Sequence, residues 1–207
     1  MSADTPRLEV MTPLQRRVIA ALCQAGGRRV GRALHDLLRE QAHHIEIFDA
    51  GVLELKEALG LLDGGGDRLI GILFDLSGSE SGRLSMVLPE RAALLLAGRL
   101  LMGQPVLDSA GALTSDASSA LVEVGNIVAS AFLNAIADAV HRACLPSPPS
   151  LVHDSQPALT ALLEKGLLSS TVLAISFETL LKDHGEPLAG GIFFAPDAQF
   201  LGAMLGQ

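Results

Sequence analysis

The feature that most constrains the fold of this 207-residue chain is an internal duplication. The run Gly82-Arg83-Leu84-Ser85-Met86-Val87-Leu88-Pro89-Glu90 resembles Gly190-Gly191-Ile192-Phe193-Phe194-Ala195-Pro196-Asp197, and the helical patterns that follow end in the similar runs 100–104 and 203–207. In each half, hydrophobic periodicity predicts a long helix, a short strand, two longer strands and a closing helix. We therefore predict two copies of one helix–strand–strand–strand–helix unit, at 12–104 and 114–207, within a single domain over residues 1–207.

The predicted elements define the fold class. The first long helix should begin at the capping box Thr12-Pro13-Leu14-Gln15 and run to about Leu38. The predicted strands are 45–48, 69–76 and 83–88 in the first half and 151–153, 170–178 and 188–195 in the second. The second long helix is expected at 115–142. Since one unit cannot bury its apolar face alone, both should share one mostly antiparallel sheet, with a pseudo-two-fold axis and the two long helices on one face, which is an α+β fold.

Composition excludes several classes of protein. Hydrophobic residues make up 49% of the chain and charged residues 18%, as expected for a packed globular protein. A net charge of −8 argues against a nucleic-acid binder. No apolar run approaches the roughly 20 residues of a membrane span, and residues 1–10 do not resemble a signal peptide. With only two cysteines, we expect a cytoplasmic protein without a disulfide framework.

The predicted helix 115–142 carries a line of polar residues. Ser119, Glu123 and Asn126 stand at positions i, i+4 and i+7, at about 0°, 40° and −20° around a helix that turns roughly 100° per residue. The surrounding residues are mostly apolar, and 22 residues separate Asn126 from Pro149. An isolated Glu and Asn on a helix are usually just solvated. The spacing of all four positions, Ser119, Glu123, Asn126 and Pro149, taken together with the duplication, favours a functional site over a solvated helix face.

This spacing, Ser-x3-Glu-x2-Asn-x22-Pro, resembles the signature of the CheC-type phosphatases of bacterial chemotaxis, a family that includes CheX and the phosphatase part of FliY. The predicted duplication agrees with the architecture of that family. The resemblance implies hydrolysis of the aspartyl phosphate of a CheY-like response regulator. In this scheme Asn126 positions the attacking water and Glu123 docks on the lysine of the receiver domain. The Mg²⁺ would be supplied by the response regulator, and we expect no metal or cofactor of the chain's own.

The residue types suit this chemistry. A carboxamide can donate to and accept from one water, and it does not repel phosphoryl oxygens by charge. Phosphoryl transfer depends on positioning and charge stabilisation more than on covalent chemistry. Ser119 is expected to support Glu123 by a local hydrogen bond, and Pro149 to set the backbone direction beside the helix. Neither is expected to take part in the reaction.

The first half is predicted to have lost its site. At a constant offset of 102 residues, Arg17, Ala21 and Gln24 occupy the three motif positions, and Ile47 stands where the proline would be. Gln24 could in principle orient a water. Because the docking carboxylate is missing, we expect the first half to retain the scaffold without activity.

The first helix also carries a basic stripe. Arg17, Arg28, Arg32, His35 and Arg39 fall within about 80° of one face. A solvated helix surface is the favoured interpretation. The alternative is a second docking surface for an acidic partner.

A non-catalytic interaction module is the rival hypothesis for the whole protein. The predicted fold also resembles the middle domain of the flagellar switch protein FliM, which has a structural role. Such a module would bind or sequester a receiver domain or a flagellar switch partner. The resemblance further implies CheD, a deamidase that binds some CheC proteins, as a partner. The internal duplication is compatible with a monomer.

Overall fold

The computed structural model describes residues 11–38, 46–60, 62, 68–78, 81–165, 171–180 and 187–206. The first half contains α1 (Pro13–Leu38), β1 (Glu46–Glu54), α2 (Leu55–Gly60), β2 (Arg68–Gly78), β3 (Gly82–Pro89) and α3 (Glu90–Leu100). The second half contains α4 (Ser115–Val140), β4 (Cys144–Pro146), β5 (Ser150–Ser155), α5 (Gln156–Glu164), β6 (Thr171–Leu180), β7 (Pro187–Pro196) and α6 (Ala198–Met204).

The two halves repeat one order of elements, and their strands interlock. The sheet order is β1-β6-β7-β3-β2-β4, with β5 also pairing with β2, and every described strand pair is antiparallel. The β3–β7 pair therefore lies at the centre, with β2 and β6 on its two sides. Each first strand pairs with the other half, because β1 pairs with β6 and β5 pairs with β2. Each half supplies edge strands to the other, so the sheet is built jointly.

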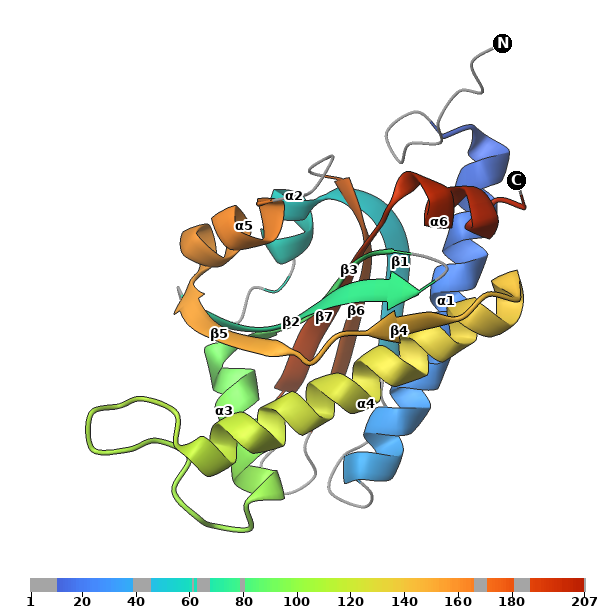
Figure 1. Cartoon of the computed structure of the whole chain (residues 1–207). Helices are drawn as coiled ribbons and strands as arrows, with labels where there is room; N and C mark the ends of the chain where they lie inside the picture. The colour runs from blue at the N-terminus through green and yellow to red at the C-terminus, as the bar shows by residue number, and fades with distance from the viewer. Residues whose placement is uncertain are drawn as a thin grey trace.

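Helices cover the two faces of the sheet unequally (Figure 1). The long helices α1 and α4 pack against each other and cover one face together with α3 and α6, enclosing the larger core. The short helices α2 and α5 contact each other on the opposite face and enclose a smaller cluster that includes Leu59, Val87, Leu159 and Phe193. The predicted α+β fold, with an antiparallel sheet and two packed long helices, is confirmed. The short helices α2 and α5 and the strand β4 were not predicted.

The core between the long helices depends on one glycine. A Cβ atom on Gly26 would lie 2.4 Å from the ring of Phe132, so only glycine lets α1 approach α4 this closely. Phe132 in turn packs edge-on against Phe194, and Phe194 against Phe200, with ring centroids 5.6 and 5.3 Å apart. An aromatic row thus runs from the helix crossing through β7 to α6 and fixes the helix layer on the sheet.

The predicted start of α1 is confirmed atom by atom. The Thr12 N–H donates to Gln15 Oε1 at 2.8 Å, and the Gln15 N–H donates to Thr12 Oγ1 at 3.3 Å. This reciprocal pair is a capping box. Pro13, the first helical residue, lacks the N–H that would otherwise need a partner.

Candidate functional site

Helix α4 is held in a fixed orientation by its ends and by its inner face. Thr114 Oγ1 accepts from the Ala117 N–H at 3.2 Å, and His141 ends the helix in the left-handed region with φ of 55°. A Cβ on Gly125 would lie 2.5 Å from Ile72 Cγ2, so the helix backbone lies directly on β2. Because the inner face is fixed in this way, packing also determines where the outer face points.

By length and composition, α4 alone among the described helices could cross a membrane. Half of its most apolar window is buried in the protein, against α1 and the sheet. Its apolar composition is therefore accounted for by the core, in which Leu121, Val124, Val128 and Phe132 are fully enclosed.

The motif residues occupy the outer face of α4. Ser119 and Glu123 are exposed and Asn126 is half-buried, and exposed Ser130 and Asn134 continue the same line toward the C-terminus. We call these five residues the outer line of α4. Among the described residues, neither the Glu123 carboxylate nor the Asn126 carboxamide has a hydrogen-bond or ion-pair partner. The hydrogen bond expected from Ser119 to Glu123 is likewise not formed. Both functional groups are thus available to an external molecule.

The segment that carries Pro149 is held against the sheet edge beside α4. The Asp75 N–H donates to Ser147 Oγ at 3.1 Å, and the Ser147 N–H donates to the Asp75 carbonyl at 2.8 Å. Pro149 is half-buried and immediately precedes β5, and both β4 and β5 contact α4. The fourth motif position therefore lies in a segment that flanks the motif helix.

The corresponding positions of the first half lie on the outer face of α1. Arg17, Ala21 and Gln24 are all exposed, and exposed Arg28 and Arg32 continue the series. We call these five residues the outer line of α1. It offers one carboxamide, at Gln24, and no carboxylate. The fourth position, residue 47, lies in β1, and the structure does not describe its side chain.

The basic stripe of α1 includes three described arginines that make no contact with charged or polar groups of the fold. Among the described residues, Arg17, Arg28 and Arg32 make no hydrogen bond or ion pair. Their neighbour Arg29 differs, because its Nη2 lies 2.5 Å from Asp138 Oδ2 on α4. Arg39 lies outside the described residues. The position of the stripe fits both a solvated face and a docking face.

The two cysteines are buried and do not form a disulfide. Burial raises the pKa of the Cys23 thiol from 9.0 to about 12, because the thiolate would lose its hydration inside the helix layer. Cys23 is therefore a packed core residue and not a nucleophile at neutral pH. Within the described part of the chain, no group of three His, Cys, Asp or Glu residues could hold a metal ion.

The Ser–Glu–Asn line on the outer face of α4, followed by a proline just before β5, resembles the signature of the CheC-like family. A family model described as the CheC-like family matches residues 117–153, from the motif helix into β5. The CheY-P phosphatase CheC of Bacillus subtilis (strain 168) is 25% identical over 187 residues, covering 88% of each protein.

Solved structures agree on the fold. Thermotoga maritima FliY matches with a TM-score of 0.70 at 14% identity, over 95% of this chain and 96% of the FliY chain. A chain of the FliM–SpeE complex of H. pylori matches at 0.66 and 13% identity, over 94% and 96%. A chain of the CheX–CheY–BeF₃–Mg²⁺ complex of Borrelia burgdorferi matches at 0.56 and 19% identity, over 83% and 96%. The predicted resemblance to the CheC-like family is confirmed, and the chain is similar in sequence to a CheY-P phosphatase.

Proposed function

We propose that this protein is a phosphatase that hydrolyses the aspartyl phosphate of a CheY-like response regulator, with one working site on α4. One observation carries the proposal. Glu123 and Asn126 stand side by side on the outer face of a helix whose inner face is fixed in the core, and neither has a partner among the described residues. A rigid helix that presents an acid and a carboxamide can enter the active site of another protein.

The proposed reaction needs only positioning from this chain. Asn126 orients a water in line with the phosphorus, the water oxygen bonds to phosphorus, and the bond to the aspartyl oxygen breaks. The products are inorganic phosphate and the free aspartate carboxylate of the receiver, with one proton released to solvent. Glu123 pairs with the lysine of the receiver and fixes the register of docking. This division suits phosphoryl transfer, in which orientation and electrostatics carry most of the catalysis.

The receiver supplies the remaining components. The Mg²⁺ that neutralises the phosphoryl oxygens belongs to the response regulator, and we place the reaction in the cytoplasm. Two relatives support this partner. The B. subtilis relative is a CheY-P phosphatase, and a structural neighbour comes from a complex of CheX with CheY, BeF₃ and Mg²⁺. CheD remains a separate expectation from the resemblance, and no described contact bears on it.

Phosphate release from the purified receivers of the host tests the proposal. The native protein should accelerate release from at least one receiver, and Asn126→Ala should reduce that acceleration by about 100-fold or more, the usual cost of losing a group that positions or stabilises the reacting atoms. Asn134→Ala is a matched control, because Asn134 is exposed on the same line two turns further on. It should keep the native rate. If the native protein accelerates release from none of the receivers, the phosphatase assignment is wrong.

Glu123→Gln separates docking from water positioning. The substitution keeps the shape of the side chain and removes its charge, so it should raise KM for the phosphorylated receiver more than it lowers kcat. A fall in kcat alone, with KM unchanged, would instead assign Glu123 to the chemical step.

A non-catalytic binding module is the second candidate, and the structural match to a chain of the FliM–SpeE complex supports it, because the resemblance to FliM implies a structural role. The same release assay distinguishes the two. A stable complex with the phosphorylated receiver, together with an unchanged phosphate lifetime, would identify a binding module.

A further inference from the structure

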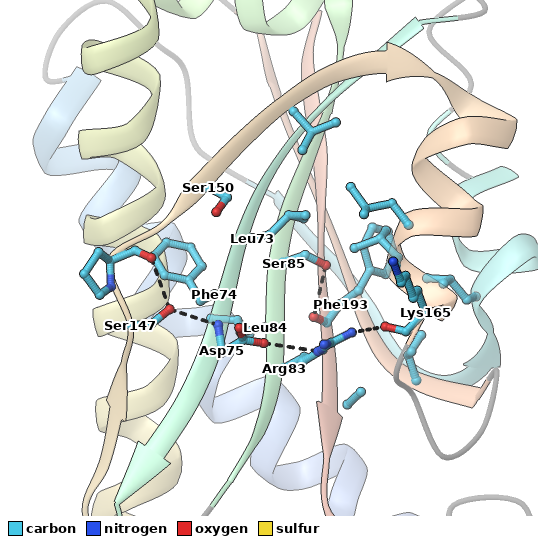
Figure 2. Close-up of a pocket in the computed structure, with 17 residues that line it drawn as sticks. Leu73, Phe74, Asp75, Arg83, Leu84, Ser85, Ser147, Ser150, Lys165 and Phe193 are labelled. Carbon is cyan, nitrogen blue, oxygen red and sulfur yellow. Dashed lines mark hydrogen bonds and ion pairs between the residues drawn. The ribbon is translucent and has the colours of Figure 1, made fainter.

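A cavity of about 560 Å³ lies on the face of the sheet opposite α1 and α4. Figure 2 shows it between the sheet, the β4–β5 segment and α5. Its floor comes from the central strands, with Leu73 of β2, Ser85 of β3 and Phe193 of β7. Its volume lies in the range of small-molecule sites. The sheet separates it from the outer line of α4, while Ser147, Pro148 and Ser150 on its lining flank the motif residue Pro149.

The cavity exists because the short helices cover only part of this face. Next to it, a Cβ on Gly71 would lie 2.9 Å from Leu159 of α5, so α5 rests directly on β2 there. Helix α5 ends near Leu73. Side chains from α5 and β5, such as Leu163 and Val152, line the sides of the cavity there but do not cover it. Leu162, also on the lining, is 40% exposed. An apolar floor and apolar walls are thus open at one side.

The hydroxyl of Ser85 lies at the floor of the cavity with hydrogen-bonding capacity to spare. Ser85 is only 5% exposed, and its Oγ makes one hydrogen bond among the described residues, to the Phe193 carbonyl at 3.5 Å. That distance is long for a hydroxyl donor, which usually bonds at about 2.7–2.8 Å. A buried hydroxyl held this weakly can accept or donate one further hydrogen bond inside the cavity.

The mouth carries an excess of positive charge. Arg83 Nε lies 3.1 Å from Asp75 Oδ1, and an Arg83 Nη1–H donates to the Lys165 carbonyl, which ties the end of α5 to β3 (Figure 2). Three charged residues line the cavity, Arg83, Lys165 and Asp75, and their charges sum to one positive charge. The backbone carbonyl of Lys165 accepts the hydrogen bond from Arg83. The side-chain ammonium of Lys165 has no partner among the described residues.

We propose that this cavity binds a small amphipathic carboxylate, whose hydrocarbon part lies on the Leu73–Phe193 floor and whose head group lies at the Arg83–Lys165 mouth. The apolar lining selects the hydrocarbon part, and the positive mouth selects an anionic head over a neutral or cationic one.

Three probes with one alkyl chain test the proposal on the full chain. Octanoate, 1-octanol and octylammonium are titrated separately, with chemical-shift changes in backbone amides of β2, β3 and β7 as the readout. Octanoate should bind saturably and at least about threefold more tightly than 1-octanol, and octylammonium should bind most weakly. Absence of saturable octanoate binding up to about 10 mM overturns the site. Equal affinities for the three probes overturn the choice of a carboxylate.

Two lysine variants locate the head group. Lys165→Gln keeps the backbone carbonyl that holds Arg83, so the mouth stays intact, and it should weaken octanoate binding by about three- to tenfold without changing 1-octanol binding. Lys56→Gln is the matched control, because Lys56 is an exposed lysine of α2 that pairs with Glu164 and is not among the lining residues. It should bind octanoate like the native protein. An equal loss in both variants, or in neither, contradicts the assignment of the head group to the mouth.

Discussion

The outer faces of α1 and α4 occupy corresponding places in the two halves but carry different chemistry. At an offset of 102 residues, the outer line of α4 reads Ser119, Glu123, Asn126, Ser130 and Asn134, and the outer line of α1 reads Arg17, Ala21, Gln24, Arg28 and Arg32. The first is neutral apart from one acid, and the second is cationic. Since neither line packs against the sheet, the residues of both are free to change without disturbing the core. The comparison teaches that two copies of one scaffold can keep the same fold while the outer faces of their long helices carry different residues.

The inner faces of the same helices differ too, but there the differences compensate. Cys23 of α1 corresponds to Gly125 of α4, and Gly26 of α1 corresponds to Val128. Gly125 leaves room for Ile72 and Gly26 leaves room for the Phe132 ring. Each small residue is matched to a large neighbour, so the two helices need complementary surfaces and not identical sequences.

The largest expected effect is the difference in phosphate release between removing the Asn126 carboxamide and removing the Gln24 carboxamide. Asn126→Ala should lower the accelerated release of phosphate by about 100-fold or more, whereas Gln24→Ala should leave it within about twofold, because the first line lacks the docking acid. Both variants are measured in one phosphate-release assay against the same receiver. A comparable loss in Gln24→Ala would show that the first half is active and would remove the asymmetry between the halves.

The next largest expected effect is a loss of stability when the contact between α1 and α4 is overpacked. Gly26→Ala would place a Cβ 2.4 Å from the buried Phe132 ring, so it should destabilise the fold by about 1–2 kcal/mol, after the gain in helix propensity is subtracted from the cost of overpacking. Chemical denaturation measures this change. Gly98→Ala is the control within α3, because its Cβ would meet Val106 at an ordinary 3.6 Å. That variant should be stabilised by about 0.5–1 kcal/mol.

The sequence could predict elements whose signals are local. The capping box at Thr12 and the longer strands appear close to where they were expected, and helical periodicity alone placed Ser119, Glu123 and Asn126 on one face of α4. The short helices α2 and α5 were missed, because helices of six and nine residues contain too few turns to show a period. The exchange of edge strands between halves depends on pairings between distant segments, which no local pattern encodes. The cavity beside Ser85 was missed for the same reason, since its lining comes from seven separate elements and their connections.

Cys23, buried on α1, should make the stability of the protein decrease at alkaline pH. Its pKa is raised from 9.0 to about 12 in the fold, so the native state favours the protonated thiol more strongly than the unfolded state does. This contribution to stability is complete below pH 9 and is lost as the pH rises toward 12, at about 1.4 kcal/mol per pH unit. Denaturation of the native protein and of Cys23→Ala at pH 8 and about pH 10 isolates the effect. The native protein should lose about 1.4 kcal/mol more than the variant; equal losses would contradict the buried thiol.

Rebuilding the motif on α1 should have a smaller effect. The triple substitution Arg17→Ser, Ala21→Glu and Gln24→Asn gives the first helix the three helical residues of the α4 motif. All three positions are exposed, so the fold should tolerate the change. Two independent sites should at most double the rate of phosphate release. Measuring the triple variant in the Asn126→Ala background removes the signal of the second site. No release there, with a native circular dichroism spectrum, would show that the motif needs more than these three residues.

The smallest expected effect concerns the basic stripe. Arg28→Glu with Arg32→Glu reverses two charges that make no ion pair among the described residues, so the free energy of unfolding should change by less than about 0.5 kcal/mol. If the stripe is a solvated face, the affinity for the phosphorylated receiver should also stay within about twofold, since exposed charges outside an interface are screened by salt. Arg29→Glu is the contrasting variant, because it breaks the Arg29–Asp138 pair between α1 and α4 and acts on stability alone. A loss of affinity only in the variant with both Arg28→Glu and Arg32→Glu, which disappears at high salt, would give the opposite answer. It would identify the outer line of α1 as a docking surface for an acidic partner. The first half would then contribute binding and the second half catalysis.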